Sequence, residues 1–400
     1  MDRSVPTQTT ALRVALVSEY YYPDIGGMPE HVHQLGRALV GRGHQVTVIT
    51  TSFPGHVDIP SDPPFDVVRL GRASPPLITN GSLSLAAIGL GLRRKLLRLF
   101  AERRFDVIHV HAPIFPTLSL LAISCAPDAA IVVGTLHTHF ERSPVIELFR
   151  RPLQRYLDAL DGLIAVSDTA LRSMQRIGFS CQAEIIPNGV DLPAWQSGQV
   201  LPSLRGQAKL VLLGQARLEP RNHFETVIAA QRRLVHDGLA LRLHVLGDGP
   251  RRTELQRLAH GLDTHFAGSV VAARPDYAAS SDVFCFTADI ASHPMSLIEG
   301  MAAALPIIAH SISGVRELVS DGKEGLLVPL GDDRAYAEAL RALYQSPSLR
   351  KELGDRARKQ VESLGWPQIA RKIESKYLEL AKNRRSQRTS AARDLSLAWP

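Results

Sequence analysis

Cysteine is scarce in this chain of 400 residues, which has only three: Cys125, Cys181 and Cys285. They lie far apart and form no metal-binding pattern, so we expect structural or free thiols and no metal site. The first ten residues are polar, unlike a secretory signal peptide. No uninterrupted apolar run reaches the roughly 20 residues that span a bilayer, since Pro127 and Asp128 break the closest candidate. We therefore expect a cytoplasmic protein, either free or peripheral on the inner face of the membrane.

Acidic residues are outnumbered, because 46 Lys and Arg against 39 Asp and Glu give a formal net charge of +7. A basic excess favours phosphate-bearing partners such as nucleotides, anionic lipid or nucleic acid. Zinc-finger and RNA-binding signatures are absent, so we expect no nucleic-acid partner. The hydrophobic content of 45% is ordinary for a globular protein.

Short apolar runs alternate with helical patterns in the first half of the chain. Residues 13–18 form such a run, a loop with two glycines follows, residues 30–42 place apolar side chains on one helical stripe, and residues 45–50 indicate a second strand. Strand, glycine loop, helix and strand make the βαβ unit of a parallel sheet. Further strands are predicted at residues 106–110, 131–135, 163–166 and 184–186.

A second series of strands begins after residues 192–206, whose Pro, Ser, Gly and Gln are typical of a domain boundary. Its predicted strands are residues 209–213, 241–246, 282–286, 306–309 and 325–328. We therefore predict an α/β protein with two Rossmann-like, doubly wound domains. Their ligands should bind beyond the carboxyl ends of the strands, in the cleft between the domains.

The predicted division of the chain has four parts. Residues 1–195 form the N-terminal domain, and residues 196–365 form the C-terminal domain. Residues 366–382 form a helix that crosses back to the N-terminal domain. Residues 383–400, with four arginines among Ser, Thr and Ala, are expected to be a disordered basic tail.

Polar or glycine residues follow three of the predicted strands. Gly26 and Gly27 either let backbone amides approach an anion at a helix N-terminus or form a tight turn without a ligand. His137 either hydrogen-bonds a sugar hydroxyl or is satisfied by loop backbone. Arg217 and Arg221 could clamp a diphosphate, since guanidinium forks match phosphate oxygens, or form a solvated surface pair.

Two later segments carry weaker signals. Gly247 lies in a turn after a strand, where glycine would admit a nucleotide close to the backbone. Glu299 begins a helical segment of small and apolar residues, where it could hold a ribose diol or merely favour the helix dipole. The amides of Met295, Ser296 and Leu297 would point toward a phosphate in that geometry.

Together and in this order, these segments resemble family 4 of the retaining glycosyltransferases, which have the GT-B fold. The resemblance covers residues 13–382 and includes two further typical segments, residues 165–168 and 186–191. It implies transfer of a hexose from a nucleoside-diphosphate sugar to a lipid or saccharide acceptor with retention of configuration, without a metal or another cofactor. The loop at residues 18–32 is similar to that of enzymes that glycosylate phosphatidylinositol.

The resemblance also implies roles for single residues. Gly26 and Gly27 match the loop over the donor phosphate and the acceptor, and His137 matches the histidine on the transferred sugar. Arg217 matches the arginine on the diphosphate, and Glu299 the glutamate on the ribose. The predicted catalytic residues are His137, Arg217 and Glu299. The predicted donor site consists of Gly26, Gly27, Arg217, Arg221, Gly247, Ser296, Leu297, Ile298 and Glu299.

The sequence departs from the family pattern in two places. Asn222 and His223 stand where the family has lysine and glycine, and Ala291 stands where it has a glutamate, eight positions before Glu299. Arg221 could replace the lysine, whereas nothing obvious replaces the glutamate, although Asp289 is two residues away. The alternative function is therefore a catalytically impaired homologue that binds a nucleotide and acts as a regulatory or partner protein.

One basic helical segment bears on the acceptor. Four apolar side chains fall on one face, with cationic side chains around them. A basic amphipathic helix can lie on an anionic membrane surface, or it can pack on the sheet and leave a solvated basic edge. The apolar residues are Leu92, Leu96, Leu99 and Phe100, and the cationic ones are Arg93, Arg94, Lys95, Arg98, Arg103 and Arg104.

Overall fold

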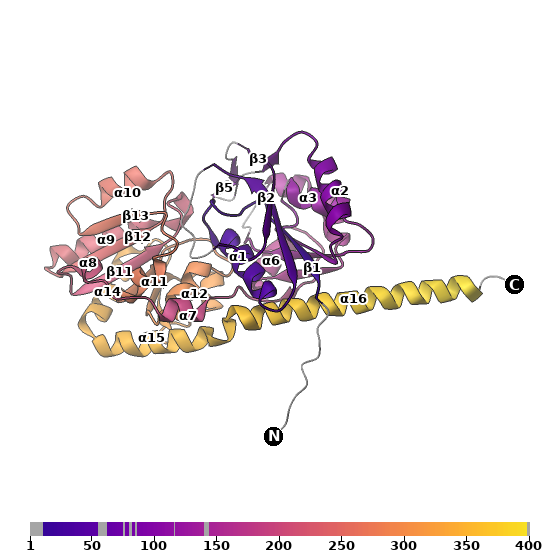
Figure 1. Ribbon diagram of the computed structural model, residues 1–400. Coiled ribbons are helices and arrows are strands. Elements are labelled where there is room, and N and C mark those ends of the chain that lie inside the picture. Colours follow the sequence, from indigo (N-terminus) through magenta and orange to yellow (C-terminus); the bar gives the residue numbers. More distant parts are fainter. Residues whose placement is uncertain are drawn as a thin grey trace, which may run out of the picture.

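The computed structural model describes residues 11–54, 62–74, 77–79, 82–84, 86–115, 117–139 and 144–397. It contains two parallel sheets that lie side by side, each with helices packed on it (Figure 1). The first ten residues, for which the sequence predicts no signal peptide, lie outside this description, as do residues 398–400. Within the described residues, no helix is both long and apolar enough to cross a membrane.

The N-terminal sheet has eight strands in the order β10-β9-β8-β7-β1-β2-β3-β6. All neighbours pair in parallel except β3 and β6. The strands are β1 (Arg13–Val17), β2 (Gln45–Ser52), β3 (Asp66–Ala73), β6 (Ala87–Ile88), β7 (Val107–His111), β8 (Ile131–Leu136), β9 (Gly162–Ala165) and β10 (Glu184–Ile185), and a separate hairpin joins β4 (Leu77–Thr79) to β5 (Ser82–Ser84). The helices are α1 (Gly27–Val40), α2 (Leu92–Arg103), α3 (Leu118–Cys125), α4 (Pro144–Leu148), α5 (Arg150–Asp158) and α6 (Asp168–Arg176).

The C-terminal sheet has six parallel strands in the order β13-β12-β11-β14-β15-β16. They are β11 (Leu210–Gln215), β12 (Leu241–Leu246), β13 (Thr264–Gly268), β14 (Val283–Phe286), β15 (Ile307–His310) and β16 (Gly325–Val328). The helices are α7 (Leu192–Gln196), α8 (Pro202–Arg205), α9 (Phe224–His236), α10 (Arg252–Leu258), α11 (Arg274–Ala279), α12 (Met295–Ala302), α13 (Ser313–Arg316), α14 (Asp333–Gln345) and α15 (Pro347–Val361), with short 3-10 turns at Pro220–Asn222 and Glu362–Leu364. The predicted domain boundary, between residues 195 and 196, falls within α7.

Both sheets are doubly wound, and each therefore has a point where the chain reverses its direction of travel across the sheet. In the N-terminal sheet this point lies between β1 and β7, and in the C-terminal sheet it lies between β11 and β14. Ligands of doubly wound sheets bind beyond the carboxyl ends of the strands at such points. The loops after β1, β11 and β14 are consequently the places to look for a site.

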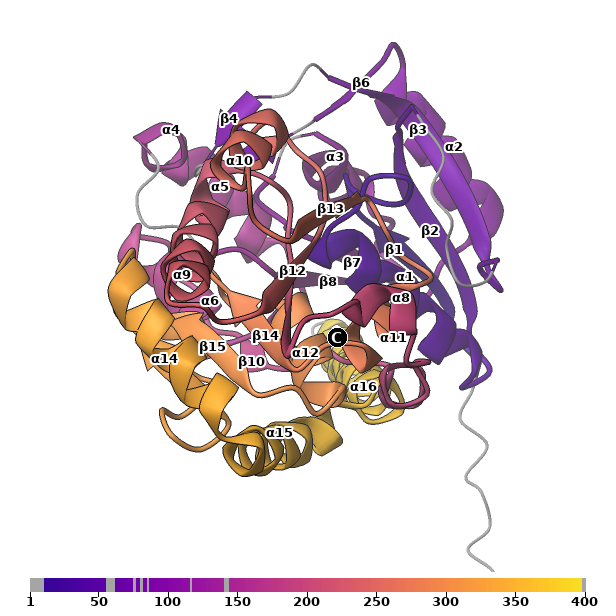
Figure 2. The ribbon, with the colours of Figure 1, turned by 90° about the vertical axis from the view of Figure 1, so that its left-hand side faces the viewer.

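The long helix α16 (Trp366–Leu397) returns from the C-terminal domain and runs along the N-terminal one (Figures 1 and 2). Glu374 accepts hydrogen bonds from Arg42 and lies 3.0 Å from Nε2 of His44. The Tyr377 hydroxyl lies 2.7 Å from Nδ1 of His109 in β7. One hydrophobic cluster joins α16 to α1 and to α12, so the two domains share a continuous core.

The structure bears on two expectations from the sequence, one about the basic helical segment at residues 92–104 and one about the C-terminal tail. In α2, Leu92, Leu96 and Phe100 are buried against β3 and α3, so most of the apolar stripe packs inside the protein, and the exposed face carries basic side chains together with Leu97. This outcome favours the second alternative for that stripe. The stretch expected to be a disordered tail is helical as far as Leu397, which is consistent with its Arg, Gln, Ala and Leu, all good helix formers.

Candidate functional site

The carboxyl-end loops of the two sheets meet at the domain interface. The Ser292 hydroxyl, in the loop after β14, donates to the carbonyl of His137 after β8, over 2.5 Å. Nδ2 of Asn188 in the N-terminal domain donates to the carbonyl of His293 over 2.7 Å. These bonds bring the predicted sugar-binding histidine beside the loop that leads into α12.

The first turns of α1 and α12 converge at this interface. Gly26 is extended, with φ 172° and ψ 177°, and Gly27 is the first residue of α1. A Cβ atom added to Gly27 would lie 3.3 Å from Cγ of Met295, the first residue of α12. The first amides of a helix have no intrahelical acceptor and carry partial positive charge. Two helix N-termini that meet in this way can bind one anion between them.

Arg217 lies two residues beyond β11, on the reversal point of the C-terminal sheet. Its Nε lies 3.5 Å from Oε1 of Glu219. Both side chains affect the pKa of Asp24, which lies in the loop after β1. Burial raises this pKa to about 6, the positive charge of Arg217 lowers it, and the negative charge of Glu219 raises it. Arg217 therefore lies near Asp24, which precedes Gly26 by two residues in the loop after β1.

Arg221 is half-buried and lies close to Arg217. Burial lowers the pKa of Arg221, and the charge of Arg217 lowers it further. Its Nη2 lies 3.5 Å from the carbonyl of Ile290 in the loop after β14. Two guanidinium groups held this close repel each other, and a bound polyphosphate would relieve that repulsion.

The backbone at Gly247, after β12, has a conformation and a close neighbour that only glycine accommodates. Its φ is 133°, and a Cβ atom there would lie 1.9 Å from the carbonyl oxygen of Ala216. Its amide donates to Gly268 over 2.8 Å. The loop after β12 thus crosses the Arg217 loop at van der Waals distance, which only glycine permits. A role of Gly247 on a nucleotide stays a prediction.

Glu299 lies in the second turn of α12 and is buried, with 2% of its surface exposed. Its Oε2 accepts from Nε2 of Gln215 over 2.6 Å, and its Oε1 accepts from Nη1 of Arg274 over 3.2 Å. Burial raises the pKa of Glu299, and Arg274 offsets only part of this rise. The carboxylate lies behind Ser296, Leu297 and Ile298 in the first turn of α12, and its role on a ribose stays a prediction.

His137 belongs to a buried group of imidazoles. Its Nε2 lies 2.9 Å from Nδ1 of His111 in β7, and the ring centroid of His31 in α1 lies 4.6 Å from its own. Burial lowers the pKa of His137 well below its usual range, with His31 and His109 adding to the effect. The ring is therefore neutral, and with Nε2 engaged only its Nδ1 could contact a sugar.

The nitrogens of His31, His111 and His137 lie within 4.8 Å of one another, a spacing that could hold a metal ion. The direct contact between the rings of His111 and His137 takes up one nitrogen from each. We interpret the group as a hydrogen-bonded pair packed against a third ring.

The chain matches two family descriptions, "Glycosyltransferase Family 4" over residues 25–193 and "Glycosyl transferases group 1" over residues 207–346. It is 32% identical over 370 residues to the phosphatidyl-myo-inositol mannosyltransferase of Mycolicibacterium smegmatis, covering 92% of this chain and 93% of that protein. The chain belongs to glycosyltransferase family 4. This family 4 enzyme is a hexosyltransferase. It is also 22% identical over 364 residues to the alpha-monoglucosyldiacylglycerol synthase of Streptococcus pneumoniae, covering 85% of this chain and 80% of that one.

Solved structures show that the fold of this family 4 glycosyltransferase is GT-B. Anabaena HepE in complex with UDP-glucose superimposes with a TM-score of 0.71 at 18% identity, over 92% of this chain and all of that one. Sucrose-phosphate synthase from Thermosynechococcus elongatus gives a TM-score of 0.69 at 22% identity, over 92% and 99%. The predicted fold and family are thereby confirmed.

The two departures from the family pattern have clear positions in this glycosyltransferase. Nδ2 of Asn222 donates to the carbonyl of Arg217 over 2.7 Å, and its own carbonyl accepts from Thr287 over 2.5 Å. Asn222 therefore fixes the Arg217 loop and offers no cation to a phosphate. Ala291 is 8% exposed, and its carbonyl packs against Gly314, so no carboxylate extends from that position.

Sequence reasoning missed three polar residues of this glycosyltransferase's interface: Gln215, Arg274 and Glu30. The hydrogen bonds that join these three residues to Glu299 or to each other span 25 to 244 residues, so no local motif marks them. The sequence offered one indication that Arg274 belongs to the interface. This arginine begins a short helix that ends just before a buried strand.

Proposed function

We propose that this hexosyltransferase takes a hexose from a nucleoside-diphosphate sugar and transfers it, with retention of configuration, to the headgroup of a membrane lipid. The observation that carries the proposal is the meeting of two helix N-termini, at Gly27 and Met295, beside the Arg217 and Arg221 guanidinium groups. Four sources of positive charge at one interface suit a diphosphate.

The donor would lie mainly on the C-terminal domain. The diphosphate would contact Arg217, Arg221 and the amides of Ser296 and Leu297, and the nucleoside would extend along Gly247 toward Glu299. The acceptor would enter from the N-terminal domain beside Gly26 and Gly27, where Nδ1 of His137 can bond a hydroxyl of the transferred sugar.

The proposed transfer step needs no cofactor, because the bond formed, the bond broken and the proton are all accounted for by the two substrates. The acceptor oxygen forms a bond to the anomeric carbon on the face from which the diphosphate departs, and the acceptor proton passes to a leaving phosphate oxygen. The pair Arg217 and Arg221 would stabilise the charge that develops on the diphosphate. This route uses cationic side chains and helix N-termini in place of a metal ion.

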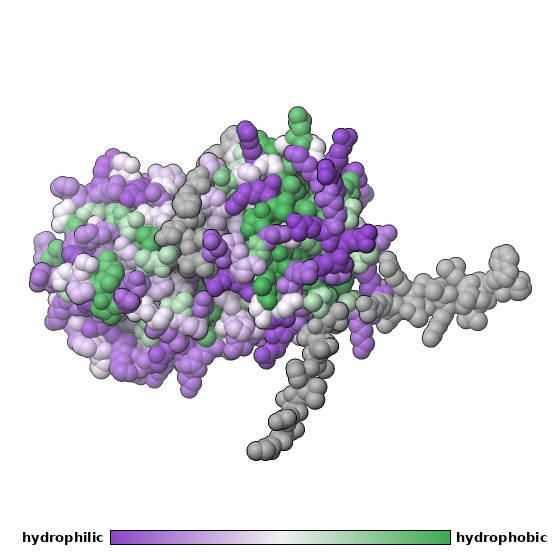
Figure 3. All heavy atoms as spheres, viewed as in Figure 1, coloured by the Kyte–Doolittle hydropathy of each residue, from purple (hydrophilic) through white to green (hydrophobic). Residues whose placement is uncertain are grey.

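A lipid acceptor is supported by two relatives, since the Mycolicibacterium protein is named for phosphatidyl-myo-inositol and the Streptococcus protein for a diacylglycerol. The surface of the N-terminal domain adds a physical reason. Around α2, the exposed apolar side chains Ile88, Leu90 and Leu97 lie close in sequence to exposed arginines and a lysine, and Figure 3 shows apolar and charged side chains interspersed on this domain. Such a surface suits the anionic face of a membrane.

The membrane contact is tested by sedimentation with vesicles that contain phosphatidylinositol. We expect Arg93→Glu, Arg94→Glu and Lys95→Glu together to reduce the bound fraction, because each cation near an anionic surface contributes about 1 kcal/mol. The matched control is Arg356→Glu on α15, whose side chain is also exposed. Equal binding of all proteins would contradict the membrane contact.

The transfer itself is tested with uridine, guanosine and adenosine diphosphate hexoses and phosphatidylinositol vesicles. We expect one donor to raise the melting temperature and to yield a glycolipid, whose anomeric configuration by NMR equals that of the donor. An inverted product would overturn the retaining route.

A regulatory homologue is the second candidate, because Asn222 and Ala291 leave out a lysine and a glutamate. The double variant Asn222→Lys and Ala291→Glu separates the two functions. Transfer by the native chain supports the enzyme, whereas turnover in the double variant alone supports the regulatory protein.

A further inference from the structure

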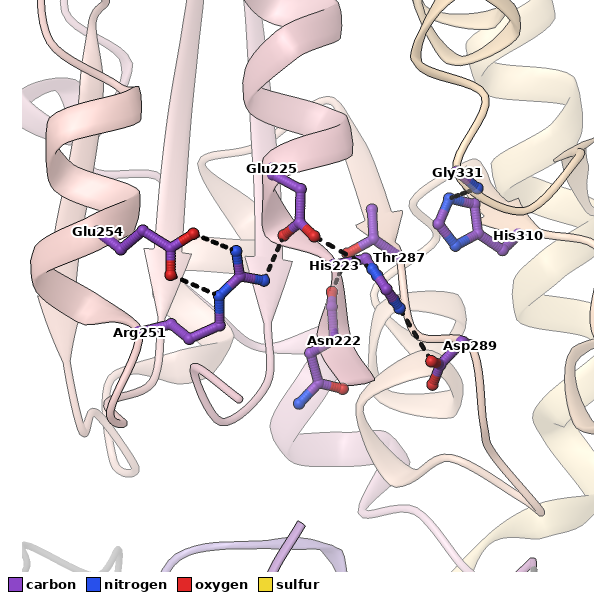
Figure 4. A network of polar contacts seen from close by, with 9 residues as sticks. All are labelled: Asn222, His223, Glu225, Arg251, Glu254, Thr287, Asp289, His310 and Gly331. Atoms are coloured by element: carbon purple, nitrogen blue, oxygen red, sulfur yellow. Dashed lines mark hydrogen bonds and ion pairs between the residues drawn. The ribbon is translucent and has the colours of Figure 1, made fainter. Parts of the chain in front are cut away.

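His223, at the start of α9, has a left-handed backbone, with φ 41° and ψ 41°. Residues other than glycine rarely adopt this conformation, and they keep it only where the surroundings hold them there. The side chain of His223 explains why histidine is held at this turn, since it reaches carboxylates on two different elements (Figure 4).

The imidazole lies between two carboxylates. Its Nε2 lies 2.9 Å from Oδ2 of Asp289, and its Nδ1 lies 3.1 Å from Oε1 of Glu225. Arg251 holds Glu225 from the other side over 2.7 Å and is itself paired with Glu254 over 2.6 Å. Carboxylates only accept hydrogen bonds, so the ring serves both of them as a donor when it is an imidazolium. The network fixes His223 and, through it, the carboxylate of Asp289.

The two carboxylate oxygens of Asp289 differ in their contacts, since Oδ2 contacts His223. Oδ1 is buried and has no hydrogen-bond partner among the described residues. A buried carboxylate oxygen without a donor is costly, and such atoms in native proteins call for a ligand or a water. Oδ1 of Asp289 is thus an acceptor that no group in the described part of the chain satisfies.

The location of this acceptor is informative. Asp289 follows β14, and its amide donates to the carbonyl of Arg221 over 3.0 Å. Arg221 follows β11, so the two loops flank the reversal point of the C-terminal sheet. Asp289 therefore lies beside Arg221, its charge acts on the Arg221 guanidinium group assigned to the diphosphate, and the loop continues from it to His293 and α12.

We propose that Oδ1 of Asp289 accepts a hydrogen bond from a hydroxyl of the transferred hexose, and that His223 is the positioning residue that orients this carboxylate. The inference rests on the proposed function and deepens it. The proposal also defines the class of sugar that is transferred. The hexose must have a free hydroxyl at the position that contacts Asp289, because a carboxylate at that position would be repelled by the Asp289 carboxylate.

The test compares two ligands, the nucleoside diphosphate alone and the same nucleotide with its hexose, by titration calorimetry. In Asp289→Asn we expect the sugar nucleotide to bind about 10- to 150-fold more weakly, the range for one charge-assisted hydrogen bond. The bare diphosphate should bind as it does to the native protein, which also shows that the variant is folded.

His223→Asn provides a second variant, because asparagine tolerates a left-handed backbone. It should weaken the sugar nucleotide in the same selective way, and His223→Asn with Asp289→Asn should be no worse than Asp289→Asn alone. Glu338→Gln, an exposed glutamate on α14 outside this network, is the control and should bind both ligands normally.

Three results decide the matter. Selective loss of the sugar nucleotide supports the proposal. Equal weakening of both ligands, or no weakening of either, overturns it while leaving the proposed function intact. If the native protein binds neither ligand, the proposed function itself fails.

Discussion

Nη2 of Arg274 in the C-terminal domain donates to Oε2 of Glu30 in the N-terminal domain over 2.6 Å. The same guanidinium bonds Glu299 through Nη1, so one cation serves two carboxylates from different domains. Glu30 also accepts from Tyr22 over 2.6 Å and from Gln34 over 2.9 Å. Burial opposes the ionisation of Glu30, but Arg274 and these hydrogen bonds outweigh it and lower the pKa of Glu30. Glu299, the predicted ribose residue, is thus tied to α1 of the N-terminal domain.

Replacing this cation tests the link between the domains. The Arg274→Met variant should be destabilised by about 3–5 kcal/mol, because it leaves two buried carboxylates without their partner. Urea unfolding measures the loss. Arg274→Met combined with Glu30→Gln should recover part of it, whereas Arg233→Met, whose partner Asp333 is on the outer face, should cost less than about 1 kcal/mol. Equal losses in the Arg274 and Arg233 variants would contradict the buried link.

The crossing of two loops at Gly247 gives a second prediction. Gly247→Ala should lower stability by about 3 kcal/mol or more, since its Cβ would collide with the Ala216 carbonyl at an unfavourable φ. Gly261→Ala has a similar positive φ, 80°, but open space around it, so it should cost about 1–2 kcal/mol. Thermal unfolding of both variants checks the difference, and similar melting temperatures would show that the loops do not cross as described.

Much of the fold follows from local sequence, and the reasons are specific. Continuous apolar runs such as residues 14–17 and 210–213 favour strands buried on both faces, which parallel sheets require. The glycine loop before α1 and the apolar stripe of that helix complete the βαβ unit. The order of such units, combined with the resemblance, was enough to predict GT-B.

The interior of the site was not predictable in the same way. The pairing of His223 with Asp289, 66 residues apart, depends on the packing of two loops, and no motif encodes it. The stripe of α2 shows the same limit, since an apolar helical face looks identical whether it meets lipid or a sheet. Only the tertiary contacts of Leu96 and Phe100 decided between the two.

The buried imidazoles predict a pH dependence of stability. Burial lowers the pKa of His31 and of His293 to about 4, and that of His109 to about 3, whereas an unfolded histidine titrates near 6.5. Below pH 6.5 the unfolded chain therefore binds more protons than the folded one. The free energy of unfolding should fall as the pH decreases from 6.5 to 4, by about 1.4 kcal/mol per pH unit for each such ring.

Urea unfolding at several pH values measures this slope. His293→Leu should make it shallower, while His236→Gln, whose side chain is exposed, should leave it unchanged. A slope that is the same in His293→Leu as in the native chain would mean that His293 titrates alike in both states.

The most direct measurement of the account's central claim is the affinity for a nucleoside diphosphate in Arg217→Met and Arg221→Met. If the diphosphate lies between these guanidinium groups and the two helix N-termini, each variant should bind it about 10- to 150-fold more weakly than the native chain. Arg252→Met, a partly exposed arginine on α10 that is paired with Asp248, should bind it normally. Undiminished affinity in both the Arg217 and the Arg221 variants would contradict the account.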